Sequence, residues 1–116
     1  MKFGVNTFIW TESFTKANLP LLPEIKAAGF DGIEVFLLKP ADFAAADIRR
    51  GCEANGLECT ICAVLSPDVS IISEDPGVRV AAGTHMQDCV QAAAEVGAKV
   101  IAGPLYSPVE IGRAHV

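Results

Sequence analysis

The sequence has little of what surfaces for large or charged partners need. It holds one tryptophan and one tyrosine, and its 9 Lys and Arg residues against 14 Asp and Glu residues leave a formal net charge of −5. Nucleic acids are bound by clustered basic side chains, so this balance argues against a nucleic-acid partner. No apolar run approaches the ~20 residues of a membrane-spanning helix. The first residues lead into a strand-like segment rather than a secretory signal, so we expect a cytoplasmic protein that contacts no membrane.

Disulfide and zinc chemistry are also disfavoured, although the chain contains four cysteines. Cys59 and Cys62 have C-x-x-C spacing, but they lie in a strand-like segment, where residues three apart point to opposite faces. A redox C-x-x-C motif needs its first cysteine at a helix N-terminus. Cys52 and Cys89 fall on the apolar faces of predicted helices, which is typical of small core residues.

What the sequence does contain is one pattern repeated three times: a glycine that ends a helical stretch, followed by an apolar strand-like run. The glycines are Gly29, Gly56 and Gly97. Glycine is favoured at a helix C-terminus because it enters the left-handed region without a Cβ penalty. Helices and strands that alternate in this way predict a parallel β/α fold, which places its chemistry at the C-terminal ends of the strands.

The pattern predicts four strands and three helices. The strands are expected at 2–7, 32–36, 57–63 and 99–102, and the helices at about 20–28, 42–55 and 75–96, with Asp42 and Asp75 as N-caps of the last two. Apolar spacing places Val80, Met86, Cys89, Val90 and Ala93 on the buried side of the last helix. Four parallel strands with helices on one face leave the other face uncovered. The predicted fold class is therefore α/β, the N-terminal half of a (β/α)8 TIM barrel.

Alternation along the strands separates an apolar set, expected to face the helices, from a second set that would line the barrel interior. The last members of the second set, one per strand, are Asn6, Glu34, Cys62 and Gly103. We expect them to cluster at one end of a parallel sheet of strand order 1-2-3-4, with Trp10 above them. A carboxylate at an inner strand end costs several kcal/mol unless it is paired, which favours a functional Glu34. The other three residues also have structural interpretations: Asn6 satisfies a turn, and Cys62 fills space in the core. Gly103 either ends its strand or lets a ligand approach the backbone.

Two aromatic residues, Phe8 and Trp10, follow the first strand in a loop over the same end of the barrel, as a lid over a sugar ring or as an ordinary packed cap. Four segments then carry a family resemblance: GVNTFIW (4–10), GFDGIEV (29–35), DPGVR (75–79) and GPLYSP (103–108). They resemble the sugar phosphate isomerase/epimerase superfamily of xylose isomerase-like TIM barrels. The first and last of them are most similar to ketose 3-epimerases of the D-tagatose and D-psicose type.

The resemblance implies epimerisation of a free ketose at C3, in which a divalent metal such as Mn²⁺ assists removal and return of the C3 proton. It places the metal ligands, two of which form the acid/base pair, beyond this chain. The residues that it assigns here to the sugar-facing wall or its entrance are Asn6, Trp10, Glu34, Cys62, Gly103 and Leu105. We expect the full-length enzyme to be a homo-oligomer acting on a small-molecule sugar, and this chain alone to hold no catalytic metal and to be inactive.

Other functions keep the same fold. A hydroxypyruvate isomerase or an inosose dehydratase would share both the barrel and the metal. An endonuclease IV-like repair enzyme would share the barrel, but the acidic balance disfavours it. A non-catalytic α/β binding module is disfavoured by the unfinished barrel.

The last seven residues, 110–116, do not continue the β/α pattern. Their sequence, EIGRAHV, is the translation of GAGATCGGAAGAGCACACGTC, which after its first base is a common sequencing-library adapter. We therefore expect residues 1–109 to be a partial barrel domain and residues 110–116 to be a non-native tail. The natural barrel would then have roughly 250 residues.

Overall fold

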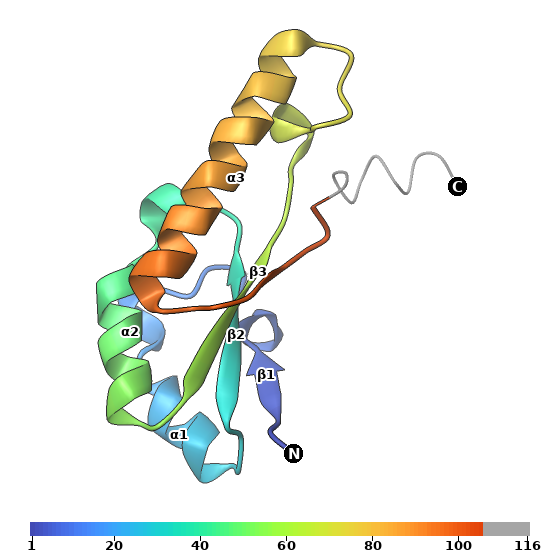
Figure 1. The fold of residues 1–116 in the computed structure, drawn as a ribbon. Helices are drawn as coiled ribbons and strands as arrows, with labels where there is room; N and C mark the ends of the chain where they lie inside the picture. The colour runs from blue at the N-terminus through green and yellow to red at the C-terminus, as the bar shows by residue number, and fades with distance from the viewer. Residues whose placement is uncertain (106–116) are drawn as a thin grey trace.

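The computed structural model describes residues 1–105 as a four-stranded parallel sheet with three α-helices (Figure 1). The strands β1 (Gly4–Asn6), β2 (Gly32–Leu37), β3 (Glu58–Ala63) and β4 (Ile101–Ala102) lie side by side in that order. The helices are α1 (Leu21–Ala27), α2 (Ala45–Ala54) and α3 (Pro76–Val96). The predicted α/β class, strand order and parallel direction are confirmed. The predicted tail, residues 110–116, lies outside the described residues.

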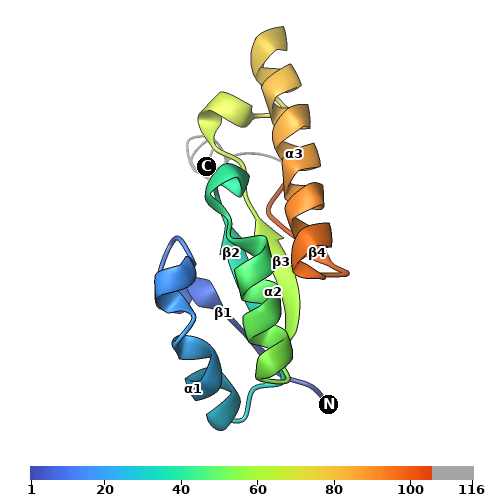
Figure 2. The same cartoon turned by 90° about the vertical axis from the view of Figure 1, so that its left-hand side faces the viewer.

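The three helices cover one face of the sheet (Figures 1 and 2). The core lies between them and the sheet, and its most buried members come from both layers. Ile33, Val35 and Ile61 of the strands and Leu22 and Ile48 of the helices are at most 2% exposed. Because full burial of one such side chain contributes about 1.5–3 kcal/mol, this layer is the main source of stability. Within residues 1–105, no α-helix covers the opposite face.

The helix ends follow the repeated sequence pattern. Gly29, Gly56 and Gly97 all adopt a positive φ, at +100°, +64° and +81°. This backbone conformation is open to glycine at little steric cost, so each helix stops there and the next strand begins. At the start of α3, the Asp75 side chain accepts a hydrogen bond of 2.8 Å from the Gly77 amide, which confirms the predicted N-cap.

The start of α2 was predicted wrongly. Asp42 belongs to a short 3₁₀ turn, closed by a 3.2 Å hydrogen bond from the Phe43 amide to the Pro40 carbonyl. The chain then becomes extended at Phe43, where ψ is 117°, so the helix cannot begin until Ala45. Its N-cap is Ala44, which offers no side-chain acceptor.

The buried face of α3 also differs from the prediction. Cys89 and Ala93 are buried as predicted, but Val80 and Val90 are 70% and 59% exposed. The small residues Ala82 and Ala92 are buried as well. The first turns of α3 extend beyond the sheet, so an apolar residue there has no strand to pack against (Figure 1). Within the described part of the chain, no helix is both long enough and apolar enough to cross a membrane.

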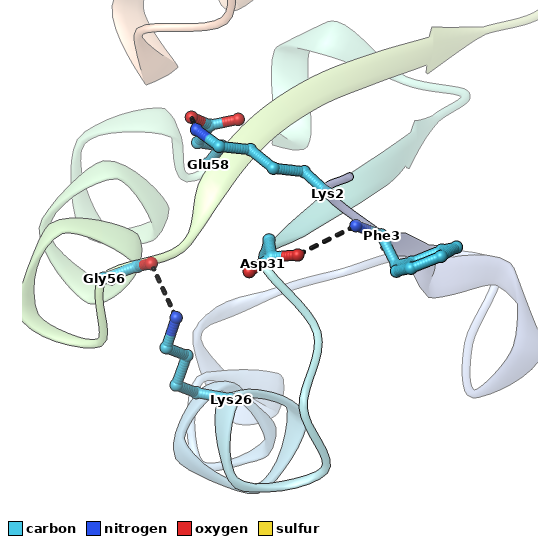
Figure 3. Close-up of polar contacts among 6 residues, drawn as sticks. All are labelled: Lys2, Phe3, Lys26, Asp31, Gly56 and Glu58. Atoms are coloured by element: carbon cyan, nitrogen blue, oxygen red, sulfur yellow. Dashed lines mark hydrogen bonds and ion pairs between the residues drawn. The ribbon is translucent and has the colours of Figure 1, made fainter.

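Polar contacts join the chain at the amino ends of the strands (Figure 3). The Phe3 amide donates to Asp31 Oδ2 at 2.9 Å, and the Asp31 amide donates back to the Phe3 carbonyl at 2.7 Å. Lys2 Nζ lies 2.5 Å from Glu58 Oε1, across the start of the sheet. These contacts hold the segment before β1 in register with the starts of β2 and β3.

Candidate functional site at the carboxyl ends of the strands

Asn6 and Glu34 form a hydrogen-bonded pair where β1 ends. The two residues are register partners in neighbouring strands, so their side chains leave the same face of the sheet, away from the helices. Asn6 Nδ2 donates to Glu34 Oε1 at 2.8 Å, and Asn6 Oδ1 accepts from the Phe8 amide at 2.8 Å. Because both ends of the amide are engaged, Asn6 fixes the position of the Glu34 carboxylate. The predicted turn role of Asn6 is therefore confirmed, and the same side chain also contacts Glu34.

The Glu34 carboxylate is held at one of its two oxygens. Its residue is half-buried, and Thr60 of β3 lies beside it in the same row of the sheet. Within residues 1–105, its second oxygen, Oε2, makes no hydrogen bond. A carboxylate that is held at one oxygen and unused at the other can accept a hydrogen bond from a hydroxyl group.

Cys62 joins this pair from the next row along β3, where its register partners are Phe36 and Ala102. Burial raises the pKa of the Cys62 thiol and the charge of Glu34 raises it further, while the neighbouring Asn6 side chain acts in the opposite direction. The thiol is consequently neutral near pH 7, as a wall or weak donor would be rather than a nucleophile. The structure thus brings together three of the predicted site residues, Asn6, Glu34 and Cys62.

An aromatic pair lies beside them, of which the sequence analysis had singled out Phe8 but not Phe36. The rings of Phe8 and Phe36 are 4.8 Å apart between centroids and tilted by 50°. The Phe36 amide donates to Thr7 Oγ1 at 3.0 Å, and Thr7 is fully buried. Phe36 could have been found, because it stands two residues after Glu34 on the same face of β2. Phe36 was predicted as the last residue of the strand, and the inner-face alternation was therefore followed only as far as Glu34.

Trp10 lies on the loop that carries Phe8. Its amide donates to the Thr7 carbonyl at 3.0 Å and closes the 3₁₀ turn Thr7–Ile9. Its side chain is 44% exposed. Trp10 is therefore tied to the end of β1 through its backbone, while its side chain is partly exposed.

Gly103 does not occupy the place predicted for it. Ile101 pairs with Ile61 and packs on the core side, and Ala102 pairs with Cys62 on the inner face. The inward residue of β4 is therefore Ala102, because the strand starts at Ile101 and its register differs from the one assumed from a start at Lys99. A Cβ added to Gly103 would lie 2.5 Å from the Leu105 amide nitrogen, so glycine permits the chain to fold back there. Leu105 packs against the core cluster.

The inner face below the Asn6–Glu34 row is hollow. A cavity of about 470 Å³ is lined by Asn6 and Glu34 and, towards the amino ends, by Gly4, Gly32 and Glu58 among others. A Cβ on Gly32 would lie 2.9 Å from the Glu58 carbonyl oxygen, so these glycines bring the strands close together and keep the face free of side chains.

The donors on this face do not make a complete metal centre. Among residues 1–105, no three His, Cys, Asp or Glu side chains gather closely enough to hold a metal ion. Glu34 is joined there by a neutral amide and a neutral thiol, whereas a hard divalent cation takes several oxygen or nitrogen ligands. The metal implied by the family resemblance would thus need ligands from outside the described residues.

A parallel sheet covered by helices on one face, with polar side chains on the other face at its carboxyl ends, defines this chain as part of a β/α barrel. Its residues 22–114 match the family described as "Xylose isomerase-like TIM barrel". The chain belongs to this family, as predicted.

Known relatives agree with this assignment. A ketose 3-epimerase of Arthrobacter globiformis is 29% identical over 111 residues, which are 95% of this chain and 38% of that protein. The structure of an L-ribulose 3-epimerase superposes with a TM-score of 0.82 at 27% identity, covering 93% of this chain and 37% of the other. A D-allulose 3-epimerase from Methylomonas sp. gives a TM-score of 0.86 at 20% identity, covering 93% and 38%, and shows the likeness in fold. The chain therefore spans well under half the length of these relatives.

Proposed function

We propose that the full-length protein is an epimerase that inverts a free ketose at C3. The observation that carries the proposal is the match of 95% of this chain to a ketose 3-epimerase. The chemistry of the strand ends supports it, since a sugar offers hydroxyl groups to a carboxylate and an amide and offers its C–H surface to aromatic rings. Asn6, Glu34, Phe8 and Phe36 supply those groups at one end of the sheet.

In this proposal, Glu34 and Asn6 bind and orient the sugar. The unused oxygen of Glu34 accepts a hydrogen bond from a substrate hydroxyl, and Asn6 keeps the carboxylate from turning away. The Phe8–Phe36 pair forms an apolar wall beside them, and Trp10 closes over the entrance. Orientation of this kind lowers the barrier because the reacting carbon is held near its acid/base partners before the reaction starts.

The reaction itself removes the proton on C3, which is acidic because C3 adjoins the C2 ketone, and returns a proton to the opposite face. The Asn6, Glu34 and Cys62 group contains a single carboxylate, so the acid/base pair would come from the remainder of the barrel. No step is assigned here to a metal, because this part of the chain does not fit a complete metal centre.

The proposal includes a cytoplasmic location, supported by the four free cysteines of the described residues, since thiols stay reduced in that compartment. It also includes a homo-oligomeric state for the full-length enzyme. Both are tested on the complete protein, so the first step is to obtain the complete coding sequence.

The test is to express the complete gene and incubate the enzyme, with Mn²⁺ supplied, with D-fructose, D-tagatose or D-psicose in D₂O. NMR should show deuterium at C3 together with the C3 epimer. An aldose product would indicate a hydroxypyruvate isomerase type of reaction instead, and loss of water from a cyclic substrate would indicate an inosose dehydratase. Either result would overturn the proposal.

The role of Glu34 is tested in the same enzyme. Glu34→Gln should lower kcat/KM roughly 10–100-fold, the value of one hydrogen bond to a charged group. Glu58→Gln is the matched control, because Glu58 lies on the same sheet but at its amino end, and it should leave kcat/KM unchanged. Equal losses in the two variants would contradict a binding role for Glu34.

A further inference from the structure

Two cysteines meet at the opposite end of the sheet from this site. Cys52 lies in the last turn of α2 and is 3% exposed, and Cys59 is the second residue of β3 and packs against the same core. The Leu57 amide donates to the Cys52 carbonyl at 2.9 Å, which folds the chain sharply from the helix into the strand. This turn brings β3 back across the end of α2, so that both cysteines line the same surface groove.

Within the described residues, the Cys59 thiol donates to the Thr60 carbonyl oxygen at 3.7 Å. The Cys59 side chain lowers the pKa of the neighbouring Cys52 thiol, whereas the Cys52 side chain, together with burial, raises the pKa of Cys59. Cys52 is therefore the thiol that ionises first and the better nucleophile of the two. In a dithiol, the neighbouring protonated thiol then serves as the resolving group.

The fold selects this pair over the one that the sequence spacing favours. Cys59 and Cys62 are close neighbours in the chain, but on β3 their side chains point to opposite faces of the sheet. Cys62 lies with Asn6 and Glu34 on the inner face, whereas Cys59 lies with Cys52 on the helix side. In the folded chain, the cysteine on the same side of the sheet as Cys59 is therefore Cys52 of the preceding helix, and not Cys62.

A surface groove gives access to the pair. It has a volume of about 450 Å³ and lies between the end of α2 and the turn from α3 to β4. Both cysteines line it, together with Arg49, Glu53 and Lys99 among others. A molecule as small as a hydroperoxide can enter a groove of this volume and reach a thiol that bulky reagents do not.

We propose that Cys52 and Cys59 form a reversible redox site in which a small hydroperoxide converts the two thiols into one disulfide. The Cys52 thiolate attacks the O–O bond of hydrogen peroxide, and the leaving hydroxide takes up a proton to become water. The Cys52 sulfenic acid that results is attacked by the sulfur of Cys59, the S–S bond forms, and a second water leaves. Overall, two thiols and one peroxide give one disulfide and two waters.

The experiment treats the folded 116-residue chain with hydrogen peroxide, blocks the remaining thiols with N-ethylmaleimide and maps the product by mass spectrometry. Cleavage after Glu53 and Glu58 separates Cys52 from Cys59 but leaves Cys59 and Cys62 in one peptide. The expected product is a cross-linked pair of peptides whose combined mass has lost two hydrogen atoms and which dithiothreitol separates. In denaturant, the product should change to a loop between Cys59 and Cys62, because short loops close most readily.

Matched variants make the result decisive. Cys59→Ala should lower the yield of intramolecular disulfide at least about tenfold, because the Cys52 sulfenic acid then lacks its resolving thiol. Cys62→Ala should leave the yield unchanged. A Cys59–Cys62 loop in the folded chain, a link from Cys52 to Cys89, or oxidation that stops at sulfinic acid would each overturn the proposal. Circular dichroism of each variant shows that the compared proteins are folded.

Discussion

The two ends of the sheet use paired charges and amides in different ways. At the amino ends, Lys2 and Glu58 form an ion pair whose side chains are 71% and 66% exposed. At the carboxyl ends, Asn6 and Glu34 are half-buried and each is held by a specific hydrogen bond. Water screens the first pair, so it contributes little, while the second pair is fixed in place and keeps an oxygen unused. The same residue types therefore hold register at one end and present a binding group at the other.

Among the substitutions that compare the two ends of the sheet, a change at Thr7 should cause the largest loss of stability. Thr7→Val removes the hydroxyl that accepts the Phe36 amide and leaves that amide without its partner beside a fully buried side chain. We expect the free energy of unfolding to fall by about 1–3 kcal/mol, the cost of an unsatisfied polar group in the interior. Urea unfolding followed by circular dichroism measures it.

Thr7→Ser is the control, since it keeps the hydroxyl and should recover most of the stability. If Thr7→Val and Thr7→Ser lose the same amount, the packing of the methyl group matters rather than the hydrogen bond. The carboxyl end would then owe its order to apolar contacts, as the core does.

The sequence predicted the strand order and the meeting of Asn6 with Glu34, because glycine-terminated helices and strand alternation are local signals. It did not predict Gly103 correctly, since the register of β4 depends on a long-range contact, the 3.1 Å hydrogen bond from the Ile61 amide to the Val100 carbonyl. The Cys52–Cys59 contact was missed for the same reason. It depends on how closely the turn after α2 folds back, which apolar periodicity does not encode.

A smaller effect is expected from the hydrogen bond that aligns β1 at the amino end. Asp31→Ala removes the acceptor of the Phe3 amide, but Phe3 is 60% exposed, so water can replace the lost partner. The free energy of unfolding should fall by about 0.5–1.5 kcal/mol, the net value of one hydrogen bond. Asp31→Asn keeps an acceptor oxygen, so its free energy of unfolding should fall less than that of Asp31→Ala. A loss as large as that of Thr7→Val would contradict the contrast between the two ends.

The alkylation rate of Cys62 tests, without an enzyme assay, whether Glu34 faces this thiol at the carboxyl end of the sheet. Burial and the charge of Glu34 raise the pKa of Cys62, so Glu34→Gln should lower that pKa and increase the thiolate fraction. At about pH 8, alkylation of Cys62 by iodoacetamide should become a few-fold faster. The measurement uses a Cys59→Ala background and mass spectrometry. Glu58→Gln, at the other end, should leave the rate unchanged, and a slower reaction in Glu34→Gln would show that Glu34 does not face the thiol.

The smallest effect should come from the Lys2–Glu58 pair. The hydrogen bond to Glu58 and the charge of that carboxylate raise the pKa of Lys2 above its ordinary 10.5. A raised folded-state pKa means that the contribution of the pair to stability is present below the ordinary pKa of Lys2 and is lost as the pH rises through the folded-state pKa. This contribution should therefore be constant across neutral pH.

Both side chains are largely exposed, and ion pairs of this kind are screened by salt. In a double-mutant cycle with Lys2→Met and Glu58→Gln, we therefore expect a coupling energy below that of every hydrogen bond discussed above, smaller still in high salt. If the coupling instead equals the loss from Asp31→Ala and resists salt, the amino end is held by its charges and the contrast with the carboxyl end disappears.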